Sequence, residues 1–155
     1  MEIYNILKEL NIEYEEIEHK AVYTIEEVLG TDIQSRIDGV ECKNLFVKNK
    51  NHFYLIFLEC NKRANLKEIS HQMGESNLRF ASEEELKQIL NLGLGSVTPL
   101  GIINDKDNKV TLLLDKELKA SKVLVHPNVN TKTLSLKFED LVKIIKYTKH
   151  RYFMI

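Results

Sequence analysis

Lys43 and Asn44 form the first polar pair that could take part in chemistry, because they stand at the entry to the apolar segment Leu45-Phe46-Val47. A lysine ammonium held at the rim of a pocket can bind a phosphate or a developing oxyanion. A lysine beside a buried strand is also commonly a solvated charge that protects the edge of a sheet. The pair by itself leaves both interpretations open.

A second candidate is the loop Gly95-Ser96-Val97-Thr98-Pro99, which has glycine at one end and proline at the other. Glycine permits close approach to the backbone, and proline fixes the direction in which the chain leaves the loop. Exposed backbone N–H groups in such a loop can point at an acyl carbonyl. The same spacing is typical of a tight connection between a helix and a strand, so the loop alone does not establish a site.

The third candidate is the turn that begins at His126, with the sequence His126-Pro127-Asn128-Val129-Asn130-Thr131. It supplies several polar groups from one rigid loop, which suits a binding site. A single histidine at a strand end is more often a packed or hydrogen-bonded structural residue. No nucleophile elbow, phosphate-binding glycine loop or HExxH motif accompanies these three segments.

Composition restricts the chemistry further. The five histidines are scattered without the spacing of metal ligands, so we expect no metal and no cofactor. Cys42 and Cys60 are the only cysteines; free thiols are favoured over a single disulfide, because nothing else suggests a secreted scaffold. The N-terminus is acidic and polar where a signal peptide needs basic residues and an apolar run, which favours a cytoplasmic protein.

Length and charge limit the possible partners. A chain of 155 residues, 43% hydrophobic and 29% charged, predicts one globular domain spanning residues 1–155. No stretch approaches the roughly 20 apolar residues that cross a bilayer, so no membrane partner is expected. The formal net charge is −1. Proteins that follow DNA or an RNA duplex along an extended track usually carry a basic excess, so any RNA contact should involve only a few bases and phosphates.

Helical periodicity and capping patterns predict the helices that must position these segments. Thr24 with Glu27, and Ser82 with Glu85, have the spacing of a capping box, and Gly30 and Gly74 are suited to helix ends. The first and last predicted helices cover residues 2–10 and 138–147. Between them, one helix opens at Thr24 and ends at Gly30, another follows Asn65 and stops at Gly74, and a third opens at Ser82. This third helix buries Leu86, Ile89 and Leu90.

Runs of apolar and β-branched residues predict the strands. They cover residues 13–17, 44–47, 52–58, 100–103, 110–115, 123–125 and 133–136. The second and third strands are joined by the turn at residues 48–51, and the third is apolar on both faces and should be central. The pattern predicts an α/β (α+β) fold with a curved, mixed, largely antiparallel sheet or partial barrel flanked by helices.

Together and in this order, the segments resemble the bacterial prolyl-tRNA editing family, the YbaK/ProX-like domains. The run GSVTP-x-G-x-I-N-D with HP-x-VNT downstream is specific, and it is most similar to the free-standing alanyl-tRNA(Pro) deacylase branch. Lys20 stands where the family commonly has proline, and Lys137 stands at a helix start where serine is usual. The matching stretches span nearly the whole chain: residues 18–24, 42–46, 61–63, 80–84, 95–105 and 126–131.

The resemblance implies hydrolysis of a mischarged aminoacyl ester without a metal or a covalent enzyme intermediate. Its critical lysine falls on Lys43, with Asn44 beside it, and the substrate's own ribose hydroxyl helps to activate water. A pocket for alanine that excludes proline would complement a synthetase, which cannot strongly reject the smaller side chain. The resemblance implies the following substrate-binding residues: Val22, Thr24, Gly95, Ser96, Val97, Thr98, Pro99, His126 and Asn130.

Two alternatives remain open at this point. The substrate could be cysteinyl-tRNA(Pro) or another small aminoacyl ester, and a substrate thiol could then attack its own ester. The chain could instead be a non-catalytic module that captures aminoacyl-tRNA ends or docks on prolyl-tRNA synthetase. The expected partner in each case is the acceptor end of tRNA(Pro), with the synthetase as a second partner. The sequence leaves open the oligomeric state and the tRNA elements that are read.

Overall fold

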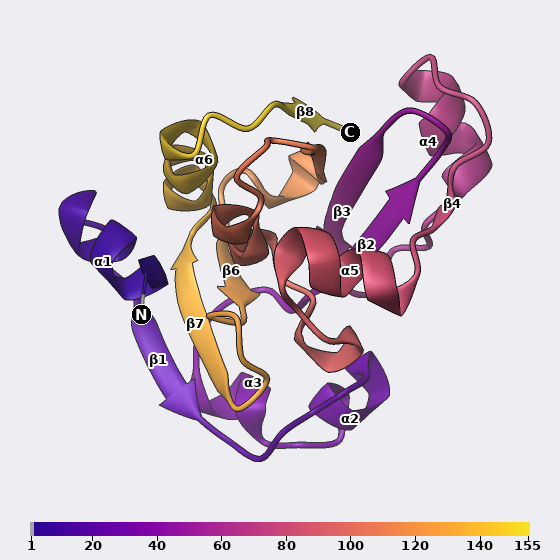
Figure 1. Cartoon of the computed structure of the whole chain (residues 1–155). Helices are drawn as coiled ribbons and strands as arrows, with labels where there is room; N and C mark the ends of the chain where they lie inside the picture. The colour runs from indigo at the N-terminus through magenta and orange to yellow at the C-terminus, as the bar shows by residue number, and fades with distance from the viewer. Residues whose placement is uncertain (1) are drawn as a thin grey trace.

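The computed structural model describes residues 2–155, apart from the side chain of Ile25. Figure 1 shows the helices arranged around the strands, with α1 and α6 on one side and α4 and α5 on the other. The α-helices are α1 (Glu2–Glu9), α2 (Ile25–Leu29), α3 (Ile33–Arg36), α4 (Leu66–Gln72), α5 (Glu83–Leu90) and α6 (Phe138–Tyr147). Three short 3-10 helices are η1 (Leu94–Ser96), η2 (Pro99–Asn104) and η3 (Lys116–Leu118).

The strands form two sheets that lie beside each other. A three-stranded sheet has the order β1-β7-β6, and a five-stranded sheet has the order β4-β2-β3-β5-β8. An isolated parallel bridge joins Val40, just before β2 of the larger sheet, to Val123 in β6 of the smaller sheet. The strands are β1 (Glu15–Glu18), β2 (Cys42–Lys48), β3 (Phe53–Glu59), β4 (Arg79–Phe80), β5 (Val110–Leu114), β6 (Lys122–Val125), β7 (Lys132–Lys137) and β8 (Tyr152–Met154).

Strand pairing confirms the predicted mixed α+β class. The pairs β1–β7, β6–β7, β2–β3 and β2–β4 are antiparallel, whereas β3–β5 and β5–β8 are parallel. The central position of β3 is also confirmed, and its residues Leu55, Ile56 and Phe57 are fully buried. A strand covered on both faces requires apolar residues at consecutive positions, which is the pattern that β3 carries.

Local capping signals position the helices close to where they were predicted. Ser82 and Glu85 form the complete capping box at the start of α5. The Thr24 hydroxyl accepts a hydrogen bond from the Glu27 amide, but the Glu27 carboxylate accepts from the amide of Tyr23 instead of closing the box on Thr24. Lys137 precedes α6 and makes no side-chain cap.

The strand predicted at residues 100–103 is wrong, because this segment is the 3-10 helix η2. Pro99 occupies the first turn, where its fixed φ suits a helix start. The Thr98 hydroxyl caps the turn by accepting from the Leu100 amide at 3.3 Å. Periodicity does not separate a buried strand from a buried helical turn over so few apolar residues, which is why the sequence predicts a strand here. The short elements α3, β4 and β8 were not predicted.

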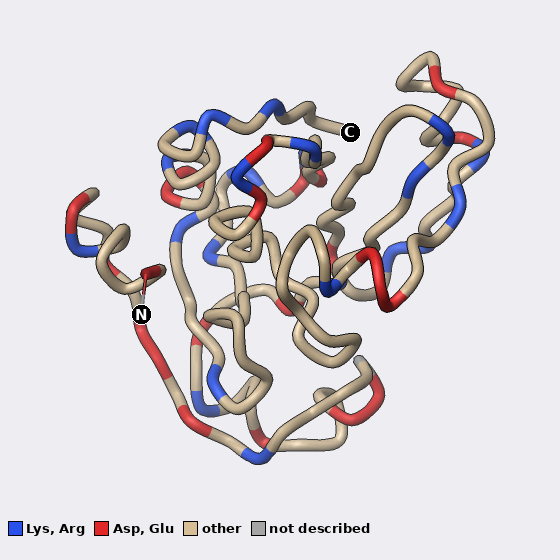
Figure 2. The backbone as a smooth tube through the Cα atoms, in the orientation of Figure 1, with Lys and Arg blue, Asp and Glu red and all other residues tan. Residues whose placement is uncertain are grey.

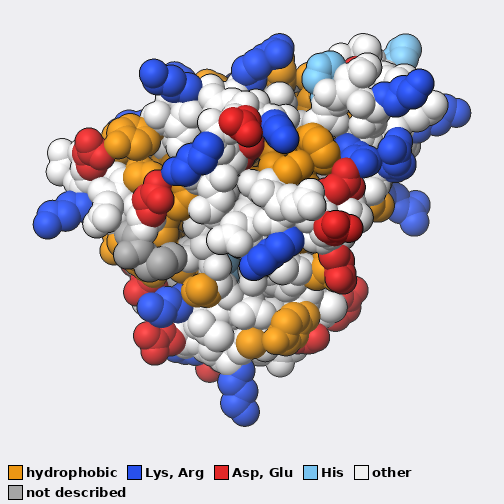
Figure 3. Space-filling view, viewed as in Figure 1, with side chains coloured by type: hydrophobic (Ala, Val, Ile, Leu, Met, Phe, Trp, Pro, Cys, Tyr) orange, Lys and Arg blue, Asp and Glu red, His pale blue; other side chains and the backbone are white. Residues whose placement is uncertain are grey.

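Charged residues of both signs are spread along the whole chain. Figure 2 shows acidic positions along β1 and at the start of α5, with basic positions along the β2–β3 hairpin and near α4. The face drawn in Figure 3 carries interspersed blue and red side chains with no continuous basic track. This distribution agrees with a near-neutral chain whose contact with a polyanion would be local.

Candidate functional site

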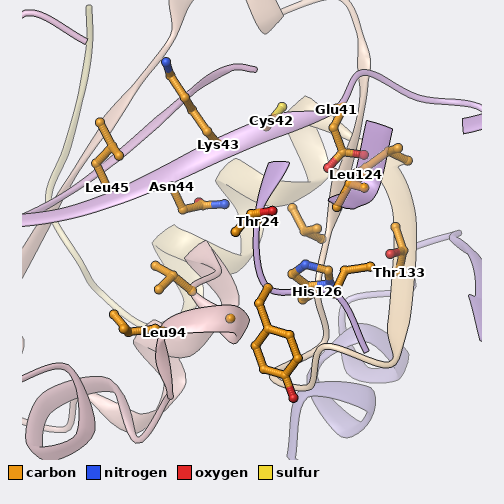
Figure 4. A pocket seen from close by; sticks show the side chains of 16 residues that line it. Thr24, Glu41, Cys42, Lys43, Asn44, Leu45, Leu94, Leu124, His126 and Thr133 are labelled. Carbon is orange, nitrogen blue, oxygen red and sulfur yellow. The ribbon is translucent and has the colours of Figure 1, made fainter. Parts of the chain in front are cut away.

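A cavity of about 240 Å³ lies between β2, the segment before α2, the loop containing η1, and the ends of β6 and β7 (Figure 4). Its wall is mostly apolar, with a few polar groups, which is the usual character of a small-ligand site. The cavity is lined by Val22, Tyr23, Thr24, Val28, Glu41, Cys42, Lys43, Asn44, Leu45, Leu94, Gly95, Val97, Leu124, Val125, His126 and Thr133.

The structure brings together most of the candidate residues from four distant parts of the chain. The residues that line the cavity are Val22, Thr24, Lys43, Asn44, Gly95, Val97 and His126. The other four, Ser96, Thr98, Pro99 and Asn130, do not line it. Direct contact between any of these residues and a ligand stays a prediction.

Lys43 and Asn44 leave opposite faces of β2, because successive side chains in a strand alternate. The Asn44 carboxamide points into the cavity, whereas the Lys43 ammonium points away from Asn44 and His126 (Figure 4). The Asn44 Oδ1 atom is buried and has no hydrogen-bond partner among the described residues. Lys43 makes no ion pair within residues 2–155. Asn44 therefore offers an unpartnered polar group to the cavity, and Lys43 is a cation without an ion pair among the described residues, on the outer side of the strand.

His126 presents a neutral imidazole to the cavity. Its Nδ1 lies 3.0 Å from the Lys132 carbonyl oxygen, so Nδ1 carries the proton and donates to that carbonyl. Burial lowers the pKa of His126, and the neighbouring His19 ring, 6.3 Å away between centroids, lowers it further. The Nε2 lone pair is therefore available to accept a hydrogen bond from a ligand near neutral pH.

Thr98 couples the glycine loop to the histidine turn. It is fully buried, and its hydroxyl donates to the His126 carbonyl oxygen at 2.7 Å. In η1 the Ser96 amide donates to the Gly93 carbonyl, while the amides of Gly95 and Val97 donate to no acceptor within the described residues. These two amides remain available to polarise a ligand carbonyl.

Asn130 fastens the histidine turn to the segment that precedes α2. Its Nδ2 donates to the Val22 carbonyl at 3.2 Å, and its own carbonyl accepts from the Val22 amide at 3.4 Å. Gly95 lies against the same segment, since a Cβ there would stand 2.5 Å from Cδ1 of Tyr23. Thr98 and Asn130 thus stabilise the cavity wall through hydrogen bonds, although neither residue lines the cavity.

Glu41 is a cavity residue that the sequence interpretation missed. It precedes β2, is only 9% exposed, and its carboxylate makes no hydrogen bond or ion pair within residues 2–155. Burial raises the pKa of Glu41 from 4.5 to about 7. A glutamate next to a lysine-containing strand resembles a solvated surface charge in sequence, and no local signal shows that it turns inward.

We expect Glu41→Gln to stabilise the protein at about pH 8 but not at about pH 4. The folded state holds the Glu41 proton more tightly than the unfolded state, so wild-type stability falls as pH rises from 4.5 to about 7. Glutamine avoids this loss, which amounts to at most about 3 kcal/mol. Urea unfolding of both proteins at the two pH values measures the difference, and an equal effect at both would contradict this prediction.

Cys42 is a poor candidate for a nucleophile, although it lines the cavity. Burial raises the pKa of its thiol well above the usual range, and the nearby Glu41 carboxylate raises it further. The reactive form of cysteine is the thiolate, which this environment disfavours. Within residues 2–155, no group of three or more His, Cys, Asp or Glu side chains is arranged to hold a metal. Within the same residues, no helix is long and apolar enough to span a bilayer.

Comparison with known proteins gives consistent matches over most of the chain. The model of the aminoacyl-tRNA editing domain family matches residues 19–144. The prolyl-tRNA editing protein ProX of Acetoanaerobium sticklandii is 42% identical over 144 residues, which cover 90% of this chain and 86% of that protein. The prolyl-tRNA synthetase associated domain-containing protein 1 of Danio rerio is 36% identical over 153 residues, covering 96% of this chain and 82% of that protein.

A solved structure supports the same fold. The crystal structure of a proposed trans-editing enzyme for prolyl-tRNA synthetase superposes with a TM-score of 0.65 at 18% identity, covering 91% of this chain and 85% of the other. The family match includes every element that lines the cavity, from the segment before α2 to β7. The chain belongs to the aminoacyl-tRNA editing domain family.

Proposed function

We propose that this protein is a trans-editing deacylase that hydrolyses the ester of mischarged alanyl-tRNA(Pro). One observation carries the proposal: a small cavity lined by Asn44, whose buried Oδ1 has no partner among the described residues, by His126 with its unprotonated nitrogen, and by the loop residues Gly95 and Val97 with unpaired amides. A buried polar atom without a protein partner is costly, so the Asn44 Oδ1 atom favours a polar ligand in this cavity.

The geometry supports a different role for each group of residues at the cavity. The amides of Gly95 and Val97 polarise the ester carbonyl, where negative charge develops during attack by water. Asn44 and His126 accept or donate hydrogen bonds at the 3′-terminal ribose and orient it. The Lys43 ammonium, on the outer face of β2, binds a phosphate of the acceptor end, which a lysine does as a point charge.

The proposed reaction needs no covalent enzyme intermediate. Cys42 is held as a thiol, and no serine or threonine in the cavity wall has a base within hydrogen-bond distance except Thr133, whose hydroxyl lies 2.8 Å from Nε2 of His19. His19 Nδ1 lies 2.8 Å from the Lys20 carbonyl, so its Nε2 accepts from Thr133. We therefore assign activation of the attacking water to the ribose hydroxyl of the substrate, with the protein stabilising the oxyanion.

The cavity supports selection of a small amino acid. Val22 is buried in the wall, and Leu124 and Val97 close the same space. A methyl side chain fits beside these groups. The proline ring has additional carbon atoms that would have to displace them, and displacing side chains in a well-packed interior is costly. The proposed partners are the acceptor end of tRNA(Pro) and prolyl-tRNA synthetase, and the proposed location is the cytoplasm.

The test is hydrolysis of four esters of tRNA(Pro) by the purified protein: alanyl, cysteinyl, seryl and prolyl. We expect the alanyl ester to be cleared at least about tenfold faster than the prolyl ester, and Lys43→Ala to lower kcat/KM by about tenfold. Faster hydrolysis of the cysteinyl ester than of the alanyl ester would replace the proposed substrate and leave the proposed enzyme class unchanged. Equal or negligible hydrolysis of alanyl and prolyl esters would contradict the proposal, as would full activity of Lys43→Ala.

A further inference from the structure

Glu41 brings a carboxylate into the cavity from the end opposite Asn44. Glu41 precedes β2, so the alternation of side chains along that strand does not extend to it. Figure 4 shows its carboxylate on the same side of the ribbon as the Asn44 carboxamide, directed toward the space beside Leu124 and His126. Three positions along an extended segment separate their Cα atoms by roughly 10 Å. A small acyl group that lies across the cavity therefore has Asn44 at one end and Glu41 at the other.

The protein supplies no cation for this carboxylate. From β2, the titratable neighbours are Cys42, which is a neutral thiol, and Lys43, whose ammonium points away. Just after β3, the second neighbouring thiol is that of Cys60, whose pKa is also raised by burial. His126 follows the end of β6, and its Nδ1–H already donates a hydrogen bond to the Lys132 carbonyl. The segment before α2 and strand β7 contribute the neutral hydroxyls of Thr24 and Thr133. A buried carboxylate is costly unless it is paired or protonated, so the cavity is incomplete without a positive or hydrogen-bond-donating ligand.

An aminoacyl ester carries such a group next to its side chain. The α-amino group of an amino acid ester titrates near neutral pH and is largely an ammonium under ordinary conditions. It lies two bonds from the carbonyl carbon, so a carbonyl held by the loop amides places the ammonium deeper in the same cavity. Burial raises the pKa of Glu41 to about 7, so the carboxylate is available in the same pH range.

We propose that Glu41 binds the α-ammonium group of the aminoacyl ester and selects free aminoacyl groups over neutral acyl groups of the same size. This inference rests on the proposed function, because it uses the same cavity and the same ester. Glu41 is then a specificity-determining residue, and the activation of water does not depend on it.

Two non-hydrolysable adenosines test the inference by binding alone. The first is 3′-(L-alanylamino)-3′-deoxyadenosine, which carries the ammonium, and the second is its L-lactylamino counterpart, in which a hydroxyl replaces that group at nearly the same size. Titration calorimetry should show the wild-type protein binding the alanyl compound at least about tenfold more tightly than the lactyl compound. In Glu41→Gln the two affinities should agree within about twofold, because the lost charge no longer distinguishes them.

The matched control is Glu59→Gln, at the end of β3. Glu59 lies opposite Cys42 in the β2–β3 ladder, and its carboxylate accepts from the Asn61 amide rather than facing the cavity. This variant should retain the wild-type affinity ratio. Equal binding of the two adenosines by the wild-type protein would overturn the inference without any variant, so the test survives a failure of Glu41→Gln to fold.

The outcomes separate this inference from the proposed function. Hydrolysis of alanyl-tRNA(Pro) with equal affinity for the two adenosines would leave the deacylase and remove the role of Glu41. A tenfold affinity ratio without hydrolysis would support the ammonium site and contradict the deacylase. A Glu41→Gln variant that keeps the affinity ratio but loses hydrolysis would identify Glu41 as a general base, which also overturns the inference.

Discussion

Asn44→Ala is expected to lower kcat for hydrolysis of the alanyl ester by about 10²-fold, because the 3′-terminal ribose loses its orientation, with little loss of stability. The Asn44 carboxamide points into the cavity, and its buried Oδ1 has no partner within the described residues. A polar atom that bonds to nothing in the free protein contributes little to folding, so its removal should leave the free energy of unfolding unchanged or slightly higher. Single-turnover deacylation and urea unfolding of the same variant measure the two quantities.

Asn49→Ala provides the matched control at the other end of β2. Asn49 is a buried asparagine, and its carboxamide donates to the Ser76 carbonyl at 3.2 Å and accepts from the amides of Asn51 and His52, each at 2.9 Å. This variant should lose about 1–3 kcal/mol of stability and keep its activity when folded. If Asn44→Ala behaved like Asn49→Ala, losing stability but not activity, Asn44 would be a structural residue.

The helices were predictable from sequence because their signals are local. The capping box of Ser82 and Glu85 and the side-chain cap of Asn65 act within one turn, so three or four residues contain the necessary information. The amphipathic spacing of α6 also lies within one segment, and its predicted bounds, 138–147, are those of the structure. Signals of this kind do not depend on how the rest of the chain folds.

The site was predictable only in part, because burial depends on contacts between distant segments. The alternation of side chains along β2 already implies that Lys43 and Asn44 face opposite ways, and this rule separates their roles before any coordinates are known. The inward orientation of Glu41 has no such signal. It depends on the bridge that joins Val40 to Val123 and on the packing of Leu124 beyond it, more than 80 positions along the chain.

Gly95→Ala is expected to reduce deacylation of the alanyl ester by about 10²-fold or more while the protein remains folded. An added Cβ would stand 2.5 Å from Cδ1 of Tyr23 and 3.2 Å from Nδ2 of Asn130, so either the loop or the Tyr23 ring must shift. Tyr23 is 65% exposed, so a shift on this side leaves the core closed and the protein folded. The part of the shift that the loop takes up moves the Gly95 and Val97 amides away from the ester carbonyl, and misplacement of such donors is costly to the rate.

Two further variants identify the cause as the contact with Tyr23. Gly93→Ala adds the same methyl group two residues away, where no atom lies within 4 Å of the new Cβ, and it should keep nearly full activity. In a Tyr23→Ala background the ring is absent, so adding Gly95→Ala should reduce kcat/KM far less than it does in the wild-type protein. This non-additivity is the signature of two residues in direct contact. Equal losses in both backgrounds would show that the glycine acts through its backbone conformation, because the steric contact would then contribute nothing.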